Sequence, residues 1–255
     1  MKEEGIFMNK LFKGLLVVGM ALTMVGCGNS NTSDSTKLLI GVSPDYAPYE
    51  SINANNEMEG FDIDMTKELV DIMNKNGGNY EYEFKQLSFD TIATSITSDQ
   101  IDLGISGFTY HEEWKGVIWS DAYNDSKQVA LVAEDSDIKT VKDLEGKKIG
   151  AQLAATGETC AKDIKGAEVN AVKDVKVLVE ALKSGGVDAV ILDYAVAKNY
   201  DVQDAYKMID ESLLEEKNMI IAKKGNDKLM EDVNKAIKEF VNSQKYTELK
   251  EKWGA

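Results

Sequence analysis

TSDQIDLGISG, residues 97–107, and KSGGVDAVILD, residues 183–193, share one pattern although they lie far apart in the chain. In each, a polar turn precedes Ile-Asp or Val-Asp, and an apolar strand follows that ends in small or polar residues. Ligands of open parallel sheets bind beyond the carboxyl ends of the strands. The repeated pattern therefore predicts two similar lobes that face each other across a cleft.

Short strand-like runs alternate with amphipathic stretches along most of the chain, which favours an α/β fold with mostly parallel strands. The predicted strands cover residues 38–42, 80–84, 101–106, 128–132, 148–151 and 187–192. Helices are predicted over residues 64–74 and 229–241, because apolar side chains recur on one face of each. We expect these faces to lie in the core.

The beginning of the chain has the layout of an export signal. Lys10 and Lys13 precede a short apolar run over residues 15–25. This run is too short for a relaxed membrane span, which needs about 20 residues. The acidic residues before Met8 fit poorly with a positively charged signal start, so Met8 competes with Met1 as the initiator.

A glycine directly before Cys27 resembles the lipobox of bacterial lipoproteins, although Met24 stands where leucine is usual. The resemblance implies that residues 1–26 are removed as a signal peptide and that Cys27 is lipidated, with residues 27–36 as a flexible polar tether. A cleaved secretory signal with an incidental cysteine and a plain anchor helix are the alternatives. The lipoprotein interpretation predicts an extracytoplasmic protein that is lipid-anchored at the cell membrane.

Charge and cysteine content exclude several classes of protein. The formal net charge of −15 argues against nucleic acid as a partner. Cys160 is the only cysteine besides Cys27, so no internal disulfide is left once Cys27 is lipidated, and a thiolate metal site is disfavoured. We expect Cys160 to pack as a small apolar residue.

Seven segments follow one another in a characteristic order and spacing. They are IGVSPDYAPYE, GFDIDMTKEL, SFDTIATSITSDQIDLGISGFT, WSDAYNDSKQVALV, VKDLEGKKIGAQ, VDAVILDYAVA and KYTELKEKWG. Together they resemble the polar amino-acid class, family 3, of extracytoplasmic solute-binding proteins that feed ABC importers. The resemblance covers nearly everything from Leu38 to Trp253.

This resemblance implies a two-lobed, type II periplasmic-binding-protein-like fold that closes over one small molecule by hinge motion. Two parallel-sheet lobes are then joined by two crossing strands. We expect residues 37–127 and 220–255 to form the first lobe and residues 128–219 the second. The crossings should lie near residues 126–129 and 219–222.

Tyr46 and Phe89 are the predicted aromatic walls of the cleft. Pro44 and Pro48, the two prolines of the chain, bracket Tyr46 in one short loop and fix its backbone. The matching tyrosine of the family stacks on the ligand side chain. Phe89 matches a second apolar wall, and its alternative is an ordinary core phenylalanine.

The predicted cation-binding end consists of Gly107, Thr109 and Asp193. In the family, the first two positions offer a carbonyl and a hydroxyl to the ligand ammonium. Asp193 follows a buried strand, where a bound cation would compensate its charge. The alternative for Asp193 is an N-cap of the following helix.

In the second lobe, Gln152 and Thr156 match positions where side chains and a helix-start N–H meet the ligand, and helix starts suit anions. The Gly-Thr-Thr run that usually follows the glutamine is replaced by LAAT, residues 153–156, which removes one hydroxyl.

The carboxylate-binding arginine of the family is missing, because this chain contains no arginine. Its position falls on Trp114 or Glu113, depending on the end from which the shortened turn is counted. Lys115 is the nearest substitute, but an ammonium lacks the fork geometry of a guanidinium.

Two ligand classes therefore stay open. One is a cation without a free α-carboxylate, such as an amine, an amide or a capped amino acid, surrounded by Tyr46, Phe89 and Trp114. The other is an ordinary amino acid held by Lys115 and backbone N–H groups.

Catalysis is the least favoured class of function, although dehydratase-like enzymes share this fold. His111 is the only histidine, and the sequence shows no nucleophile set, metal-ligand cluster or phosphate-binding glycine loop. No metal or cofactor is expected. A ligand-sensing surface lipoprotein is the alternative to transport, because both need ligand-dependent closure. The preferred interpretation is a monomeric lipoprotein that delivers a small solute to an ABC permease.

Overall fold

The computed structural model describes residues 35–255. The predicted signal peptide over residues 1–26, the lipidation at Cys27 and most of the tether lie outside the described residues. No helix within residues 35–255 is long and apolar enough to cross a membrane.

One nine-stranded sheet runs through the described residues in the order β10-β9-β11-β8-β12-β6-β1-β5, with β7 paired to β12. Its strands are β1 (Thr36–Val42), β5 (Tyr80–Gln86), β6 (Leu103–Thr109), β7 (Val117–Trp119), β8 (Asn124–Ala133), β9 (Lys148–Gln152), β10 (Glu168–Val172), β11 (Ala189–Asp193) and β12 (Tyr206–Lys223). A separate small sheet consists of β2 (Asp45–Tyr46), β3 (Glu50–Ile52) and β4 (Met58–Glu59). Each predicted strand overlaps a strand of the large sheet.

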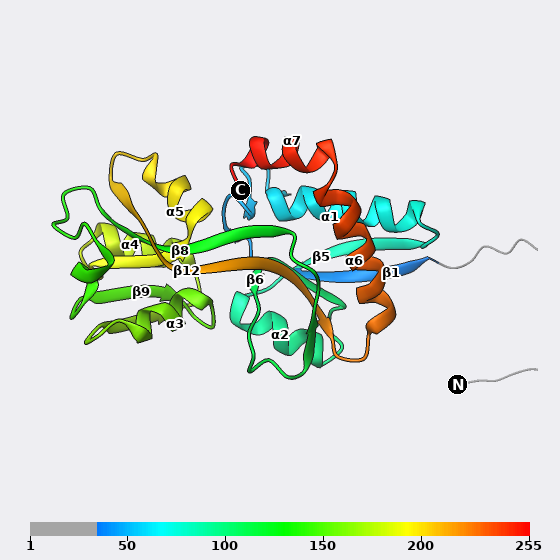
Figure 1. Cartoon of the computed structure of the whole chain (residues 1–255), viewed down its shortest axis with the longest axis horizontal. Coiled ribbons are helices and arrows are strands. Elements are labelled where there is room, and N and C mark those ends of the chain that lie inside the picture. The colour runs from blue at the N-terminus through cyan, green and yellow to red at the C-terminus, as the bar shows by residue number, and fades with distance from the viewer. Residues whose placement is uncertain (1–34) are drawn as a thin grey trace, which may run out of the picture. The chain divides into compact units, whose positions relative to one another are not determined.

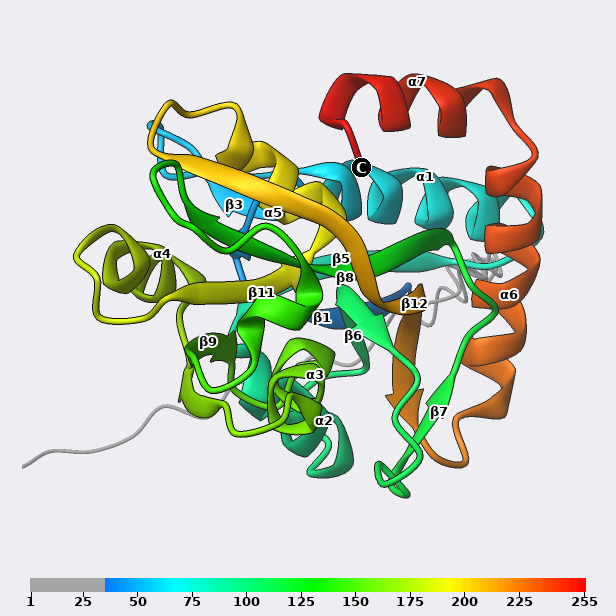
Figure 2. The same ribbon diagram turned by 60° about the vertical axis from the view of Figure 1, so that its left-hand side comes forward.

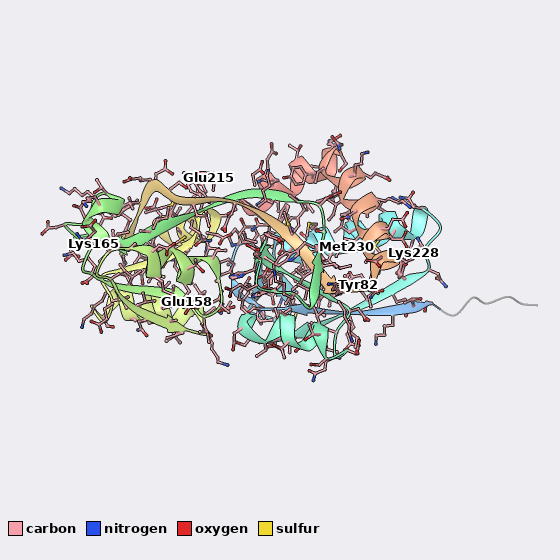
Figure 3. All side chains as sticks on the ribbon, turned by 60° about the horizontal axis from the view of Figure 1, so that its bottom comes forward. Tyr82, Glu158, Lys165, Glu215, Lys228 and Met230 are labelled. Atoms are coloured by element: carbon pink, nitrogen blue, oxygen red, sulfur yellow. The ribbon has the colours of Figure 1, made fainter. Side chains whose placement is uncertain are left out.

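The α-helices of this part of the chain are α1 (Phe61–Lys75), α2 (Phe89–Thr97), α3 (Thr156–Asp163), α4 (Val175–Lys183), α5 (Tyr194–Asp201), α6 (Asp227–Val241) and α7 (Gln244–Trp253). A short 3-10 helix covers Val141–Leu144. The helices predicted from apolar periodicity lie inside α1 and α6. On α6, Met230 is buried, whereas Lys228 is exposed and pairs with Asp232 at 2.6 Å (Figure 3).

The large sheet contains two groups of parallel strands. Strands β6, β1 and β5 form the sheet of the first lobe, and β10, β9 and β11 form that of the second. Between them, β8 and β12 pair antiparallel along much of their length, as both ribbon views show (Figures 1 and 2). In Figure 1, α1 and α7 lie above the first-lobe strands and α2 below them. The predicted α/β fold is confirmed, while the residue boundaries of the lobes stay a prediction.

The second crossing lies earlier in the chain than predicted. Residues 214–218 of β12 pair with β8, whereas Met219 and Ala222 already pair with β6 of the first lobe. The predicted position at residues 219–222 is therefore wrong. The apolar run there marks the core of the first lobe, and a crossing strand with one solvent-facing side needs no such run.

Strand β11 is buried along its whole length, because helices and neighbouring strands cover both of its faces. Its sequence is therefore a continuous apolar run that ends in Asp193. Cys160 packs beside it, in a cluster with Ile149 and Ile191. Its predicted role as a buried apolar residue is confirmed, and burial raises the pKa of its thiol to about 12.

Candidate ligand-binding site

All residues predicted for the cleft line one narrow cavity in the structure. They come from β2, the starts of α2 and α3, the ends of β6, β9 and β11, and the loop after β6. These residues are Tyr46, Phe89, Gly107, Thr109, Trp114, Gln152, Thr156 and Asp193. The cavity therefore lies at the carboxyl ends of parallel strands from both lobes, as the sequence pattern predicts.

Tyr46 and Asp193 join the lobes across this cavity. The Tyr46 hydroxyl donates to Asp193 Oδ1 at 2.8 Å and accepts from the Asp193 N–H at 3.1 Å. Asp193 stands at the N-cap position of α5, but its side chain makes no capping hydrogen bond. Its carboxylate is directed toward the cleft network instead, so the helix-cap alternative does not describe its role.

Burial raises the pKa of Asp193, and hydrogen bonds oppose this shift. Besides Tyr46, the donors are Ser126 Oγ at 3.1 Å, Gln128 Nε2 at 2.5 Å and Asn218 Nδ2 at 3.4 Å. Ser126, Gln128 and Asn218 lie on the two crossing strands. The carboxylate of Asp193 is therefore hydrogen-bonded directly to the strands that connect the lobes.

Glu216 is a second buried carboxyl group that sequence reasoning missed. Its Oε1 accepts from Gln128 Nε2 at 2.6 Å and its Oε2 from the Thr156 hydroxyl at 2.8 Å. Burial and then the charge of Asp193 raise the pKa of Glu216 to about 8. The alternation of side chains along β12 puts Glu216 on the same buried face as Asn218, but both residues are polar, so the sequence there carries no apolar alternation that would have revealed this face.

The backbone of Gly107 is held by groups behind the cavity. Its φ of 60° lies in the left-handed region that favours glycine. Its N–H donates to Asp62 Oδ2 at 3.0 Å, and its carbonyl accepts from Asn218 Nδ2 at 3.0 Å. Burial raises the pKa of Asp62 to about 7, although the Tyr123 hydroxyl donates to it at 2.8 Å. The network thus fixes the orientation of the Gly107 carbonyl.

Aromatic rings form one wall of the cavity. Phe89 stacks on Phe108 with ring centroids 4.8 Å apart. Trp114 stacks on His111 at 5.3 Å and on Trp119 at 5.7 Å. Phe89 is therefore both a core residue and a wall of the cavity. Lys115 is exposed and is not among the residues that line it.

Asp45 links the first lobe to the second beside the cavity. Its Oδ2 accepts from the Val175 N–H at the start of α4 at 2.8 Å and from Gln152 Nε2 at 3.2 Å. Lys173 also forms an ion pair with Asp90 of α2 at 2.9 Å. The lobes are thus in direct contact, and the side chain of Gln152 takes part in closing the cleft.

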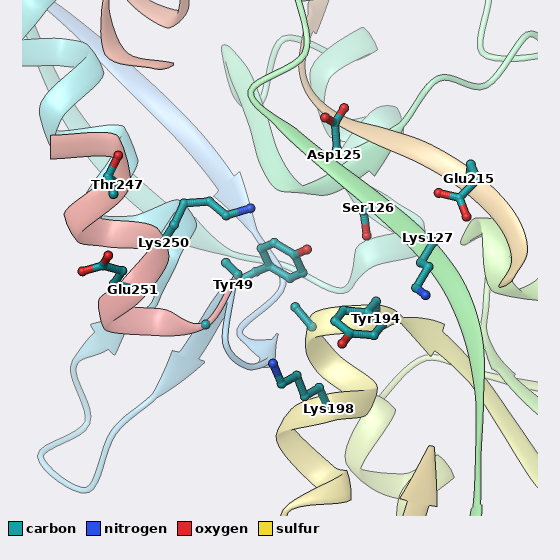
Figure 4. Close-up of a pocket in the computed structure, with 13 residues that line it drawn as sticks. Tyr49, Asp125, Ser126, Lys127, Tyr194, Lys198, Glu215, Thr247, Lys250 and Glu251 are labelled. Atoms are coloured by element: carbon teal, nitrogen blue, oxygen red, sulfur yellow. The ribbon is translucent and has the colours of Figure 1, made fainter. Parts of the chain in front are cut away.

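A separate pocket beside α7 and α5 contains charges of both signs (Figure 4). Lys250 donates to Asn124 Oδ1 at 2.5 Å, and burial lowers the pKa of its ammonium group. Lys127 lies over the Tyr194 ring, 4.7 Å from its centroid. Because none of the predicted cleft residues lines this pocket, the cavity at Asp193 is the candidate site.

Within residues 35–255 no cluster of His, Cys, Asp and Glu is arranged to hold a metal ion.

Comparison with known proteins identifies the family. The model for "Bacterial extracellular solute-binding proteins, family 3" matches residues 38–255. The arginine-binding extracellular protein ArtP of Bacillus subtilis (strain 168) is 34% identical over 256 residues, which cover 94% of this chain and 96% of that protein. The glutamine-binding protein GlnH of the same organism is 30% identical over 229 residues, covering 86% and 82%.

Solved structures agree with this result. The arginine-, lysine-, histidine-binding protein ArtJ from Geobacillus stearothermophilus aligns with a TM-score of 0.79 and 33% identity, covering 86% of this chain and 95% of that chain. An ancestral arginine-binding protein bound to arginine aligns with a TM-score of 0.78 and 35% identity, covering 86% and 98%. These matches confirm the two-lobed periplasmic-binding-protein fold. The chain therefore belongs to the family 3 bacterial extracellular solute-binding proteins, which bind amino-acid-like solutes for ABC transporters.

Proposed function

We propose that this chain captures a small cationic solute in the cleft and delivers it to an ABC permease. The observation that carries the proposal is the pair of buried carboxyl groups, Asp193 at 4% and Glu216 at 8% exposure. Burying a carboxylate costs free energy unless opposite charge or hydrogen bonds compensate it. Among the described residues, no lysine lines the cavity at Asp193. A bound cation would supply the missing charge.

The aromatic wall supports the same ligand class. Tyr46, Phe89 and Trp114 all line the cavity beside Asp193. A cation over an aromatic face gains about 0.5–2 kcal/mol for each such contact. In this proposal Gly107 and Thr109 add a carbonyl and a hydroxyl as acceptors for the N–H groups of the cation. Gln152 and Thr156 belong to the second-lobe wall.

The names of two relatives point in the same direction. ArtP is described as arginine-binding, and ArtJ as arginine-, lysine- and histidine-binding. Each of those ligands carries a cationic or protonatable side chain. The similarity covers most of both chains, which supports a cationic ligand for this chain as well.

We further propose that the mature protein is a monomer held at the membrane through lipidated Cys27, and that it performs no catalysis. The apolar run before Gly26-Cys27 supports the anchor. Membership of a family of solute-binding proteins supports the absence of catalysis. Mass spectrometry of the N-terminal peptide checks the anchor, because an unmodified Cys27 in membrane-extracted protein would exclude it.

Isothermal titration calorimetry with arginine, lysine, histidine and their decarboxylated amines tests the cation proposal. Asp193→Asn should weaken binding of the best cation by more than tenfold, because a charged hydrogen-bond partner is lost from a buried site. The matched control is Asp204→Asn, which removes an exposed carboxylate of the second lobe. An unchanged dissociation constant in Asp193→Asn, or a preference for uncharged amino acids, would exclude the proposal.

A further inference from the structure

Several hydrogen-bond donors of the cavity are already paired with acidic residues of the protein, whereas the buried Thr109 hydroxyl makes no hydrogen bond within the described residues. Six lining residues donate in this way from a hydroxyl, a side-chain amide or a backbone N–H. The donors and their acceptors are Tyr46 to Asp193, Ser106 to Glu50, Gly107 to Asp62, Gln152 to Asp45, Ala154 to Glu158 and Thr156 to Glu216. A ligand carboxylate would have to displace one of these internal carboxyl groups to gain any of these six donors.

In the loop before α3, carboxyl groups of the protein occupy donors that would otherwise be free to bind an anion. The start of a helix and the N–H groups next to it attract anions. Here the Ala154 N–H donates to Glu158 Oε2 at 2.7 Å, and the Thr156 hydroxyl donates to Glu216 Oε2 at 2.8 Å. Glu158 belongs to α3 itself and is compensated by Lys162 at 2.7 Å. Glu216 comes from the crossing strand β12 and forms no ion pair with a lysine of residues 35–255.

Glu216 is also within reach of a solute in the cleft. It lines a wider cavity that shares Thr109, His111 and Thr156 with the cavity at Asp193. A single nitrogen, Gln128 Nε2, donates to both Asp193 and Glu216, at 2.5 and 2.6 Å. The two carboxyl groups therefore lie close enough together to share one nitrogen as a donor. A single protonated amine or guanidinium group is large enough to contact both of them.

We propose that Glu216 is a specificity-determining residue that occupies the anion-binding position at the start of α3 and so selects amines or guanidines that lack a carboxylate. A zwitterionic amino acid would bring a second carboxylate against Glu216, and Lys217, the one lysine among the described residues that line the wider cavity, is already paired with Asp125. This inference rests on the proposed function and narrows its ligand class. It assigns the choice between amine and amino acid to one side chain.

Matched ligand pairs test this assignment on the full-length protein in mild detergent. The pairs are arginine with agmatine, lysine with cadaverine and histidine with histamine, each titrated calorimetrically at pH 8.5. We expect the amine of the best pair to bind at least tenfold more tightly than its amino acid. Glu216→Gln should reduce this ratio by tenfold or more, while Glu215→Gln, which changes the exposed neighbour, should keep it (Figure 4).

The outcomes separate this inference from the proposed function. If arginine, lysine or histidine binds as tightly as its amine, the Glu216 assignment is overturned although cation binding stands. An amine preference that Glu216→Gln leaves unchanged also overturns it. If no cation of any pair binds, both proposals fail. Should Glu216→Gln not fold, the wild-type ratio is a test by itself, because a ratio near one overturns the assignment.

Discussion

At the scale of single residues, Glu216 couples ligand binding to pH. Its pKa of about 8 reflects burial and then the neighbouring charge of Asp193. A bound cation favours the ionised carboxylate, so binding below pH 8 releases a proton. We expect the affinity for agmatine to rise between pH 6 and pH 8, by at most about tenfold per pH unit, and to level off above pH 8.

Calorimetry in two buffers of different ionisation enthalpy measures this proton release directly. Glu216→Gln should flatten the pH profile, because no proton is then lost at this position. Glu215→Gln should retain the wild-type profile. A wild-type affinity that is constant from pH 6 to pH 8 would contradict the coupling.

At the scale of elements, Asp45 connects β2 of the first lobe to the start of α4 in the second. Its carboxylate accepts from the Val175 N–H at 2.8 Å, where the dipole of α4 favours negative charge. Asp45→Ala should destabilise the closed arrangement and raise the dissociation constant for agmatine about tenfold, a loss of about 1.4 kcal/mol. Titration together with small-angle X-ray scattering measures both effects. Glu180→Gln, on the exposed side of α4, is the control, and an unaltered affinity in Asp45→Ala would show that this contact does not hold the lobes.

The crossing strand β12 shows where prediction from the sequence ends. Asp193 could be placed because it follows a fully buried apolar strand, and Thr156 because it matches a ligand-contacting position of the resembled family. Glu216 lies among exposed residues such as Glu215 and Lys217, and its stretch has no apolar strand pattern. Its burial depends on Gln128 and Asp193, which approach it only after the lobes have formed. The pairing of the cavity donors with acidic residues has the same origin, since most of these contacts join segments far apart in the sequence.

At the scale of the whole molecule, several buried carboxyl groups act together on stability. Burial raises the pKa of Glu50, Asp62, Asp193 and Glu216, to about 7 for Asp62 and about 8 for Glu216. In an unfolded chain such groups titrate near pH 4. Because each pKa is higher in the folded protein, its stabilising contribution is complete below about pH 4 and is lost as the pH rises through the folded value.

The ligand-free protein should therefore melt at a lower temperature at pH 8.5 than at pH 5.5. The formal net charge of −15 acts in the same direction, through repulsion between like charges. Glu83, whose paired carboxylate has a pKa of about 2, loses its contribution only at more acidic pH and does not oppose the trend. Differential scanning calorimetry at both pH values measures the difference, for which each 1 kcal/mol corresponds to about 2–4 °C. Glu216→Gln should narrow this difference in melting temperature. Saturating agmatine should also narrow it, because the bound cation compensates the buried charges at pH 8.5. A ligand-free protein that melts higher at pH 8.5 would mean that these carboxyl groups do not dominate the pH dependence of stability.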